Sequence, residues 1–179
     1  GWVFNNETGS DLTLAEFVST GDEEVRRYMH HFGFSPETLT NKTLTTNLLS
    51  GNIREKTTIV ASAATGTIAY DCLTQQILYY TTNATANFTI NVRGNASTTL
   101  NSLMATGDAI TVVFMNTNGG TAYYANAFQV DGASVTPKWQ GGTAPSAGNA
   151  SSIDGYTFTI IKTSASPTYV MLGAITKYT

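Results

Sequence analysis

The side chains able to do acid, base or nucleophilic chemistry are few, and their spacing assembles no familiar catalytic set. His30 and His31 are the two histidines of the chain. Being adjacent, they would point about 100° apart on a helix, so they do not chelate one metal ion. Cys72 is the single cysteine, which excludes an internal disulfide. With no histidine near it in the sequence, Cys72 is expected to be a small buried side chain and not a nucleophile. We therefore expect no metal and no cofactor.

Four aspartates supply all the carboxylates after residue 56, and a pair of carboxylates is the minimum for most glycoside hydrolases. Three of them stand beside glycine, in the dipeptides Gly107-Asp108, Asp131-Gly132 and Asp154-Gly155. Aspartate in such turns usually accepts hydrogen bonds from its own backbone. The fourth, Asp71, precedes Cys72. The acids therefore favour structural roles, and we expect the protein not to be an enzyme.

The clearest candidate for ligand binding is Trp139, which precedes Gln140-Gly141-Gly142 in a long polar loop. Its ring could form a platform on which a sugar stacks, or it could plug the end of a sheet. Two tyrosine pairs, at 79–80 and 123–124, would each place one ring on either face of a strand. We assign the outward rings to Tyr80 and Tyr124 and treat them, with Trp139, as ligand-binding candidates.

Charge is distributed unevenly along the 179 residues. The net charge of −3 argues against a partner that is nucleic acid or an anionic membrane. No apolar run is long enough to predict a transmembrane helix, and no signal peptide is expected. Residues 57–179 carry four acidic and four basic side chains, far below the ~25% usual in globular domains. A surface so poor in charge is weakly protected against self-association, which predicts that an oligomer or a larger particle covers part of it.

The first 56 residues differ from the rest and are interpreted as a leader or attachment segment. Thr20-Gly21-Asp22-Glu23 has the form of a capping box and predicts a short helix over residues 21–32. The apolar face of this helix consists of Val25, Tyr28, Met29 and Phe32. Three turns are marginal in isolation, so this face is expected to dock on a partner.

From Thr57 onward the pattern changes to short alternating or β-branched runs separated by turn signals. One helical turn is expected near Leu100, Leu103 and Met104. No long helical pattern lies between the strands, so parallel β-α-β units are not expected. Residues 57–179 are therefore predicted to form one all-β domain, an antiparallel β-sandwich or jelly-roll.

Two parts of the chain resemble a known class of protein. Leu39–Thr45 (LTNKTLT) resembles a segment that recurs in bacteriophage tail-fibre proteins, where it commonly precedes a β-rich module. The β body resembles a module at the ends of virion structural proteins of marine phages, cyanophages especially. That second resemblance lies in residues 87–94, 135–142 and 153–162. The resemblance implies a trimeric assembly and supplies no catalytic residues.

These observations and the resemblance together predict a non-enzymatic structural component of a phage virion, most simply a fibre or appendage module. The alternatives are a capsid decoration protein clipped to the capsid by its leader, and a carbohydrate-binding module for a host receptor. The expected partners are other virion proteins and further copies of the chain in a homotrimer, with a host-surface glycan as a further candidate.

Overall fold

A computed structural model describes residues 4–5, 11–12 and 51–179. The chain divides into two units, residues 1–51 and 52–179, which are described separately. In the first unit, β1 (Phe4–Asn5) pairs antiparallel with β2 (Asp11–Leu12). The predicted helix over residues 21–32, with Val25, Tyr28, Met29 and Phe32, lies outside the described residues, as does the LTNKTLT segment.

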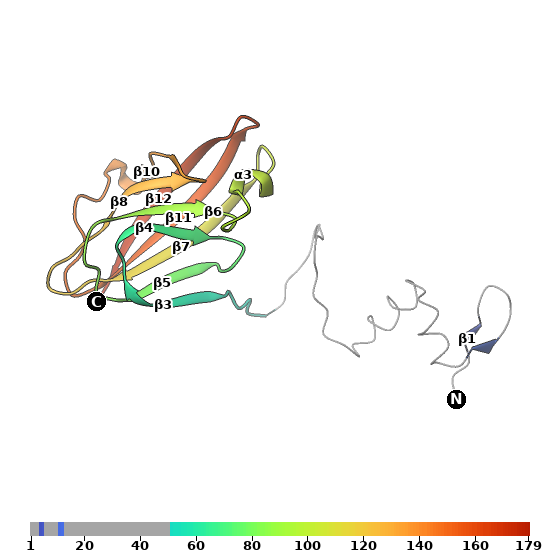
Figure 1. Ribbon diagram of the computed structural model, residues 1–179, viewed down its shortest axis with the longest axis horizontal. Helices are drawn as coiled ribbons and strands as arrows, with labels where there is room; N and C mark the ends of the chain where they lie inside the picture. Colours follow the sequence, from blue (N-terminus) through green and yellow to red (C-terminus); the bar gives the residue numbers. More distant parts are fainter. Residues whose placement is uncertain (1–3, 6–10, 13–50) are drawn as a thin grey trace. The chain divides into compact units, whose positions relative to one another are not determined.

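The regular structure of the second unit consists of strands in two sheets with very little helix, which confirms the all-β prediction (Figure 1). The six-stranded sheet has the order β10-β12-β11-β7-β5-β3 and the four-stranded sheet the order β4-β6-β8-β9. The strands are β3 (Thr57–Ala63), β4 (Gly66–Asp71), β5 (Ile77–Thr82), β6 (Phe88–Arg93), β7 (Ala109–Thr117), β8 (Ala125–Val130), β9 (Ala133–Ser134), β10 (Lys138–Trp139), β11 (Ile153–Ser164) and β12 (Thr168–Tyr178). The predicted helical turn is present as α3 (Leu100–Leu103), and a short 3₁₀ turn, η1 (Gln140–Gly142), follows β10.

The expectation of a wholly antiparallel body is wrong. In the six-stranded sheet, β3 pairs parallel with β5, and β5 with β7. In the four-stranded sheet, β4 pairs parallel with β6, and β6 with β8. The short β10 also lies parallel to β12.

The chain order explains these parallel pairs. Strands β3 to β8 alternate between the two sheets, so each return to a sheet comes after one strand in the other sheet. That intervening strand runs back in the opposite direction and serves as the crossover that parallel strands need, a role usually filled by a helix. The absence of helical patterns therefore does not exclude parallel pairing.

The antiparallel part of the body lies in its C-terminal half. The long strands β7, β11 and β12 pair in series, and β8 forms a hairpin with β9. Asp131 and Gly132 connect that hairpin, and both have positive φ, 51° and 81°. Two positive φ angles are what a two-residue type I′ turn requires, and Asp-Gly is among its favoured sequences.

One hydrophobic core joins the two sheets. Phe88 of β6 packs against Phe114 of β7 with ring centroids 5.4 Å apart, and Phe128 of β8 packs against Phe158 of β11 at 5.3 Å. Such tilted aromatic pairs pack the two sheets against each other. Among the described residues, no helix is both long and apolar enough to cross a membrane.

Candidate functional site

A groove opens at one end of the body between three chain segments. These are the β8–β9 hairpin, the residues around α3, and the tip of the β11–β12 hairpin. The groove has a volume of about 580 Å³. Its polar lining residues are Thr99, Asn101, Asp131, Ser134, Thr136 and Thr168, and apolar side chains and the ring of Tyr169 complete the wall.

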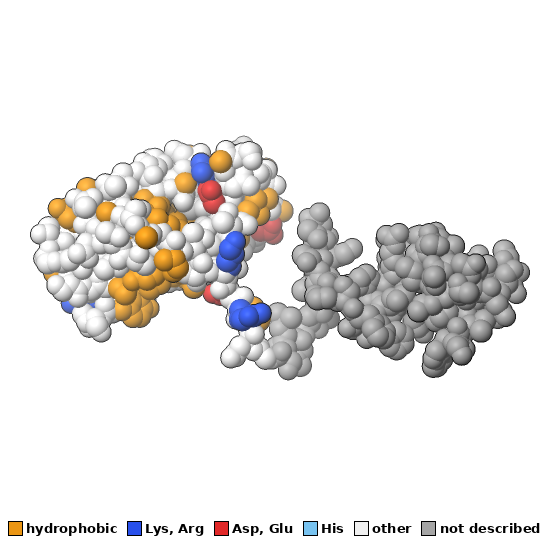
Figure 2. Space-filling model, turned by 60° about the horizontal axis from the view of Figure 1, so that its bottom comes forward, with side chains coloured by type: hydrophobic (Ala, Val, Ile, Leu, Met, Phe, Trp, Pro, Cys, Tyr) orange, Lys and Arg blue, Asp and Glu red, His pale blue; other side chains and the backbone are white. Residues whose placement is uncertain are grey.

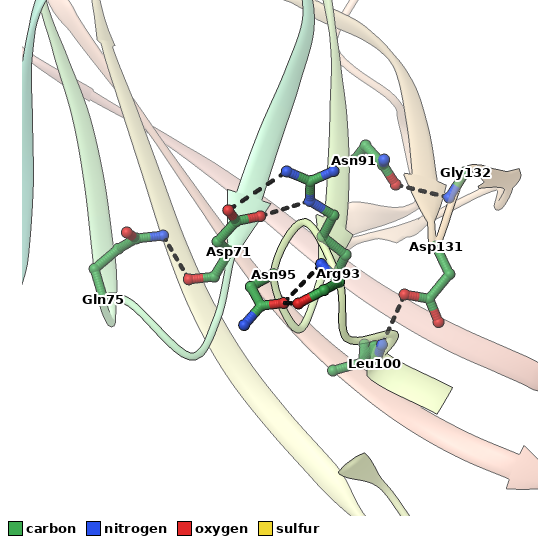
Figure 3. Close-up of polar contacts among 9 residues, drawn as sticks. Asp71, Gln75, Asn91, Arg93, Asn95, Leu100, Asp131 and Gly132 are labelled. Atoms are coloured by element: carbon green, nitrogen blue, oxygen red, sulfur yellow. Dashed lines mark hydrogen bonds and ion pairs between the residues drawn. The ribbon is translucent and has the colours of Figure 1, made fainter. Parts of the chain in front are cut away.

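Asp131 organises one side of this groove. Its carboxylate accepts a hydrogen bond from the backbone N–H of Leu100 at 2.7 Å (Figure 3) and another from that of Asn101 at 2.9 Å. The first N–H groups of a helical turn have no partner within the turn, so this carboxylate caps α3 from a distant part of the sequence. The positive φ of the hairpin turn thus places Asp131 where it fixes the position of α3.

Lys162 fixes the other end of α3. Its side chain is 7% exposed, and its Nζ donates to the backbone carbonyls of Asn101 at 3.0 Å and Met104 at 2.7 Å. Lys162 lies directly opposite Tyr169 in the β11–β12 pair, so both side chains lie on the same face of the sheet. A carboxylate and an ammonium group therefore hold the two ends of one helical turn.

Two buried polar atoms in the groove-lining residues have no hydrogen-bond partner among the described residues. They are Oδ1 of Asn101 and the hydroxyl oxygen of Tyr169. Burial raises the pKa of Tyr169, and the nearby charge of Asp131 raises it further. A buried polar atom left unpaired costs about 1–3 kcal/mol. This wall therefore has free hydrogen-bonding capacity, as does Oδ1 of Asn116 outside the groove lining.

A second group of polar contacts ties the strand ends beside the groove together (Figure 3). Asp71 and Arg93 are direct neighbours on the parallel strands β4 and β6, and Nε of Arg93 lies 2.6 Å from Oδ1 of Asp71. Both side chains are about 30% exposed, so this ion pair contributes little to stability. Asn91 accepts a hydrogen bond from the Gly132 N–H at 2.9 Å and thereby fixes the β8–β9 turn.

The remaining aspartates also have structural partners. Asp108 accepts a hydrogen bond from the Ala105 N–H at 2.7 Å. Asp154 is fully buried and accepts from the side chains of Asn118 at 3.0 Å and Asn149 at 2.6 Å. This network fixes the loops that follow β7 and precede β11. Each of the four aspartates is thus engaged by backbone, amide or guanidinium donors.

Trp139 lies half-buried on β10 with its ring against two core aromatics. The ring centroid lies 5.4 Å from that of Phe128 and 5.8 Å from that of Phe158, both in edge-to-face geometry. A Cβ atom added at Gly173 would lie 3.1 Å from the indole ring, so the ring fits closely over that glycine. These contacts favour the plug over the sugar platform.

The structure does not bring the three predicted ligand-binding rings together. Tyr80 lies on β5 and Trp139 on β10, and β12, β11 and β7 lie between these strands. The assignment of Tyr80 as the outward ring is corrected: it packs against Phe114 at 5.7 Å, and burial raises its pKa. Tyr124 lies in the loop before β8, where its backbone N–H donates to Asn87.

The nucleophile candidate Cys72 lies in the described part of the chain, and the structure does not activate its thiol. Burial raises the pKa of the Cys72 thiol, which disfavours the reactive thiolate. Across residues 4–5, 11–12 and 51–179 no cluster of three or more potential metal ligands occurs. His30 and His31 lie outside those ranges.

The groove residues Asn101 and Tyr169, and Lys162, which holds α3, did not stand out in the sequence. One signal could have indicated Lys162. Tyr156, Phe158 and Ile160 alternate on the buried face of β11, and Lys162 continues that alternation. A lysine at an inward position must find acceptors inside the protein, because a buried charge without partners is costly.

The chain was compared with protein families, with curated proteins and with solved structures. No protein-family model, curated protein or solved structure matches this chain.

Proposed function

We propose that this chain is a non-enzymatic structural component of a phage virion, with a fibre or appendage module as the first choice. The resemblance of residues 39–45 and 135–142 to phage virion proteins supports the phage assignment. The two sheets around a shared core support a sandwich-like or jelly-roll body. In this proposal residues 1–56 attach the body to the particle.

The observation that carries the structural role is the open edge of the body. Within residues 51–179, strands β3 and β4 end their respective sheets, and β3 contains neither a charged residue nor a proline. Natural proteins usually protect such edges with lysine, proline or a covering segment. Ile59 on β3 is 59% exposed. In Figure 2, where the side of the body that carries β3 comes forward, hydrophobic side chains gather in patches on a surface with few charges.

Covering this edge with a neighbouring subunit would remove its free backbone groups from solvent. The two opposite edges, β9 and β10, are two residues long and offer little to pair with. We therefore propose a homo-oligomer that buries β3. A trimer is the number that the phage resemblance implies, and a closed ring would satisfy every copy equally.

The experiment that tests the proposed function is antibody labelling of intact virions of the phage that encodes the chain, with immunogold electron microscopy as readout. Label on fibres or other appendages is the expected result. Label over the capsid shell would favour the decoration alternative, in which the leader clips the protein to the capsid. Absence of the protein from purified virions would overturn the proposal in both forms.

A further inference from the structure

We propose that the groove between the β8–β9 hairpin, α3 and the β11–β12 tip binds a saccharide. This places a ligand site away from Trp139, Tyr80 and Tyr124. Only the source of the sugar, a glycan on the host surface, rests on the proposed function. The binding of a sugar is inferred from the residues of the groove alone.

The hydrogen-bonding groups of the groove suit a ligand with many hydroxyl groups. Asn101 offers an unpaired side-chain acceptor, and Tyr169 offers a hydroxyl that can donate or accept. Ser134 and Thr136 add further hydroxyl groups to the exposed part of the lining. A sugar hydroxyl also both donates and accepts, so it can satisfy such a mixed set.

The charges around the groove favour a neutral ligand. The carboxylate of Asp131 already accepts two backbone hydrogen bonds. The ammonium group of Lys162 does not line the groove and is held by the backbone carbonyls of Asn101 and Met104. These two groups are opposite in charge and both are engaged by the backbone, so neither an anion nor a cation gains a strong net attraction.

The size and the apolar wall also fit a sugar. A volume of about 580 Å³ lies inside the range of roughly 300–1,000 Å³ typical of small-molecule sites. Val135, Pro167 and the ring of Tyr169 form apolar parts of the lining. Such surfaces suit the C–H faces of a pyranose ring, while the polar groups fix its orientation.

Access to the two unpaired atoms depends on the tip of the β11–β12 hairpin. Both atoms are buried, and Pro167 and Thr168 at the tip line the groove. Exposed hydrogen bonds between the hydroxyl of Thr168 and those of Thr163 and Ser164 help to hold this tip, together with the pairing of Ser164 with Thr168 in the β11–β12 ladder. Exposed hydrogen bonds of this kind open readily, and an outward movement of the tip lets a ligand reach the Tyr169 hydroxyl.

The test is saturation-transfer NMR on the full chain with a panel of methyl glycosides: glucose, galactose, mannose, N-acetylglucosamine and fucose. The proposal predicts that at least one of them shows saturation transfer. Tyr169→Phe removes the hydroxyl and keeps the ring, and it should weaken binding about tenfold through the lost buried hydrogen bond. Tyr79→Phe, which removes a tyrosine hydroxyl that bonds Thr117 on the same body, is the matched control and should bind normally.

Absence of saturation transfer with every glycoside, from a chain that unfolds cooperatively, overturns the groove proposal. Binding that is unchanged in the Tyr169→Phe variant also overturns it. If Trp139→Phe abolishes binding while Tyr169→Phe does not, the ligand binds at Trp139 and not in the groove. These outcomes are independent of the virion test. A protein that labels virions but binds no glycoside keeps the proposed function and loses this inference, and one that binds a glycoside but is absent from virions does the reverse.

Discussion

At the scale of single residues, the four aspartates of the body have structural roles, because each one accepts hydrogen bonds from groups that it holds in place. Asp131 illustrates this role, because one carboxylate in a two-residue turn caps a helical turn about 30 residues earlier in the chain. Lys162 provides the matching contact at the other end of that turn. The fixed position of α3 depends on these two side chains, and the groove takes its shape from α3.

Lys162→Met tests this role directly. Methionine has a similar length but cannot donate, so the carbonyls of Asn101 and Met104 lose their shared donor. We expect the free energy of unfolding, measured by urea denaturation, to fall by about 1–3 kcal/mol. The control is Lys177→Met on the exposed end of β12, which should change it by less than about 0.5 kcal/mol. Equal effects of the two substitutions would show that the buried contacts of Lys162 do not stabilise the body.

Buried tyrosines predict a loss of stability in alkali. Burial is the largest cause that raises the pKa of Tyr70, from the ordinary 10.0 to about 12, and burial also raises that of Tyr156. The unfolded chain therefore releases these protons first. The stability that these two tyrosines contribute is fully present below their ordinary pKa of 10.0 and is lost as the pH rises through their pKa in the folded protein.

The urea midpoint should thus fall as the pH rises from about 10 to about 12. The Tyr70→Phe variant should lose less over that interval, although it starts from a lower stability because the Tyr70 hydroxyl also donates to the Gln76 carbonyl. A urea midpoint in the original chain that stays constant across this range would contradict the assignment.

At the scale of secondary structure, the sequence predicts individual strands better than their partners. Residues 88–93 alternate strictly, and the structure has β6 there with alternating burial. The same holds for β11, where Tyr156, Phe158 and Ile160 point into the core. Alternation reports which face is buried, but it carries no information on which sheet receives the next strand. Parallel pairing could not be predicted for this reason.

Local signals also failed where tertiary contacts decide the structure. Residues 121–124 have strand-like composition, yet β8 begins only at Ala125, because Asn118 accepts from the Tyr123 N–H and fixes a loop there. Lys138-Trp139 lies in a stretch whose sequence predicts a loop, yet it forms the short β10. The groove brings together residues from 99 to 169, and no spacing along the chain indicates that juxtaposition.

The close contact between β10 and β12 predicts that substitution of one glycine lowers the stability of the body. A Cβ at Gly173 on β12 would lie 3.1 Å from both Trp139 and Phe158. Gly173→Ala should therefore push the indole ring away and cost about 1–3 kcal/mol of stability, as overpacking usually does. Thermal unfolding followed by tryptophan fluorescence measures it. Gly120→Ala, where a Cβ meets nothing within 4 Å, is the control, and a Gly173→Ala variant as stable as this control would contradict the close fit.

At the scale of the whole molecule, the open β3 edge connects the composition to the proposed assembly. Ile59→Lys adds a charge to this exposed strand without touching the core. Such an inserted lysine is the device that natural edge strands use against pairing. We expect the variant to be monomeric while retaining its thermal stability as an isolated body. Leu172→Lys on β12, at a similarly exposed position, should leave the oligomer intact. If both variants assemble normally, the interface lies elsewhere.

The mass of the full chain in solution tests the central claim most directly. Multi-angle light scattering at micromolar concentration should give a particle of several chains, with three times the 19.1 kDa subunit as the predicted mass. An assembly that buries β3 should hold together across a wide dilution range, since a specific interface removes more than about 1,000 Å² from solvent. A stable 19.1 kDa monomer would contradict self-assembly.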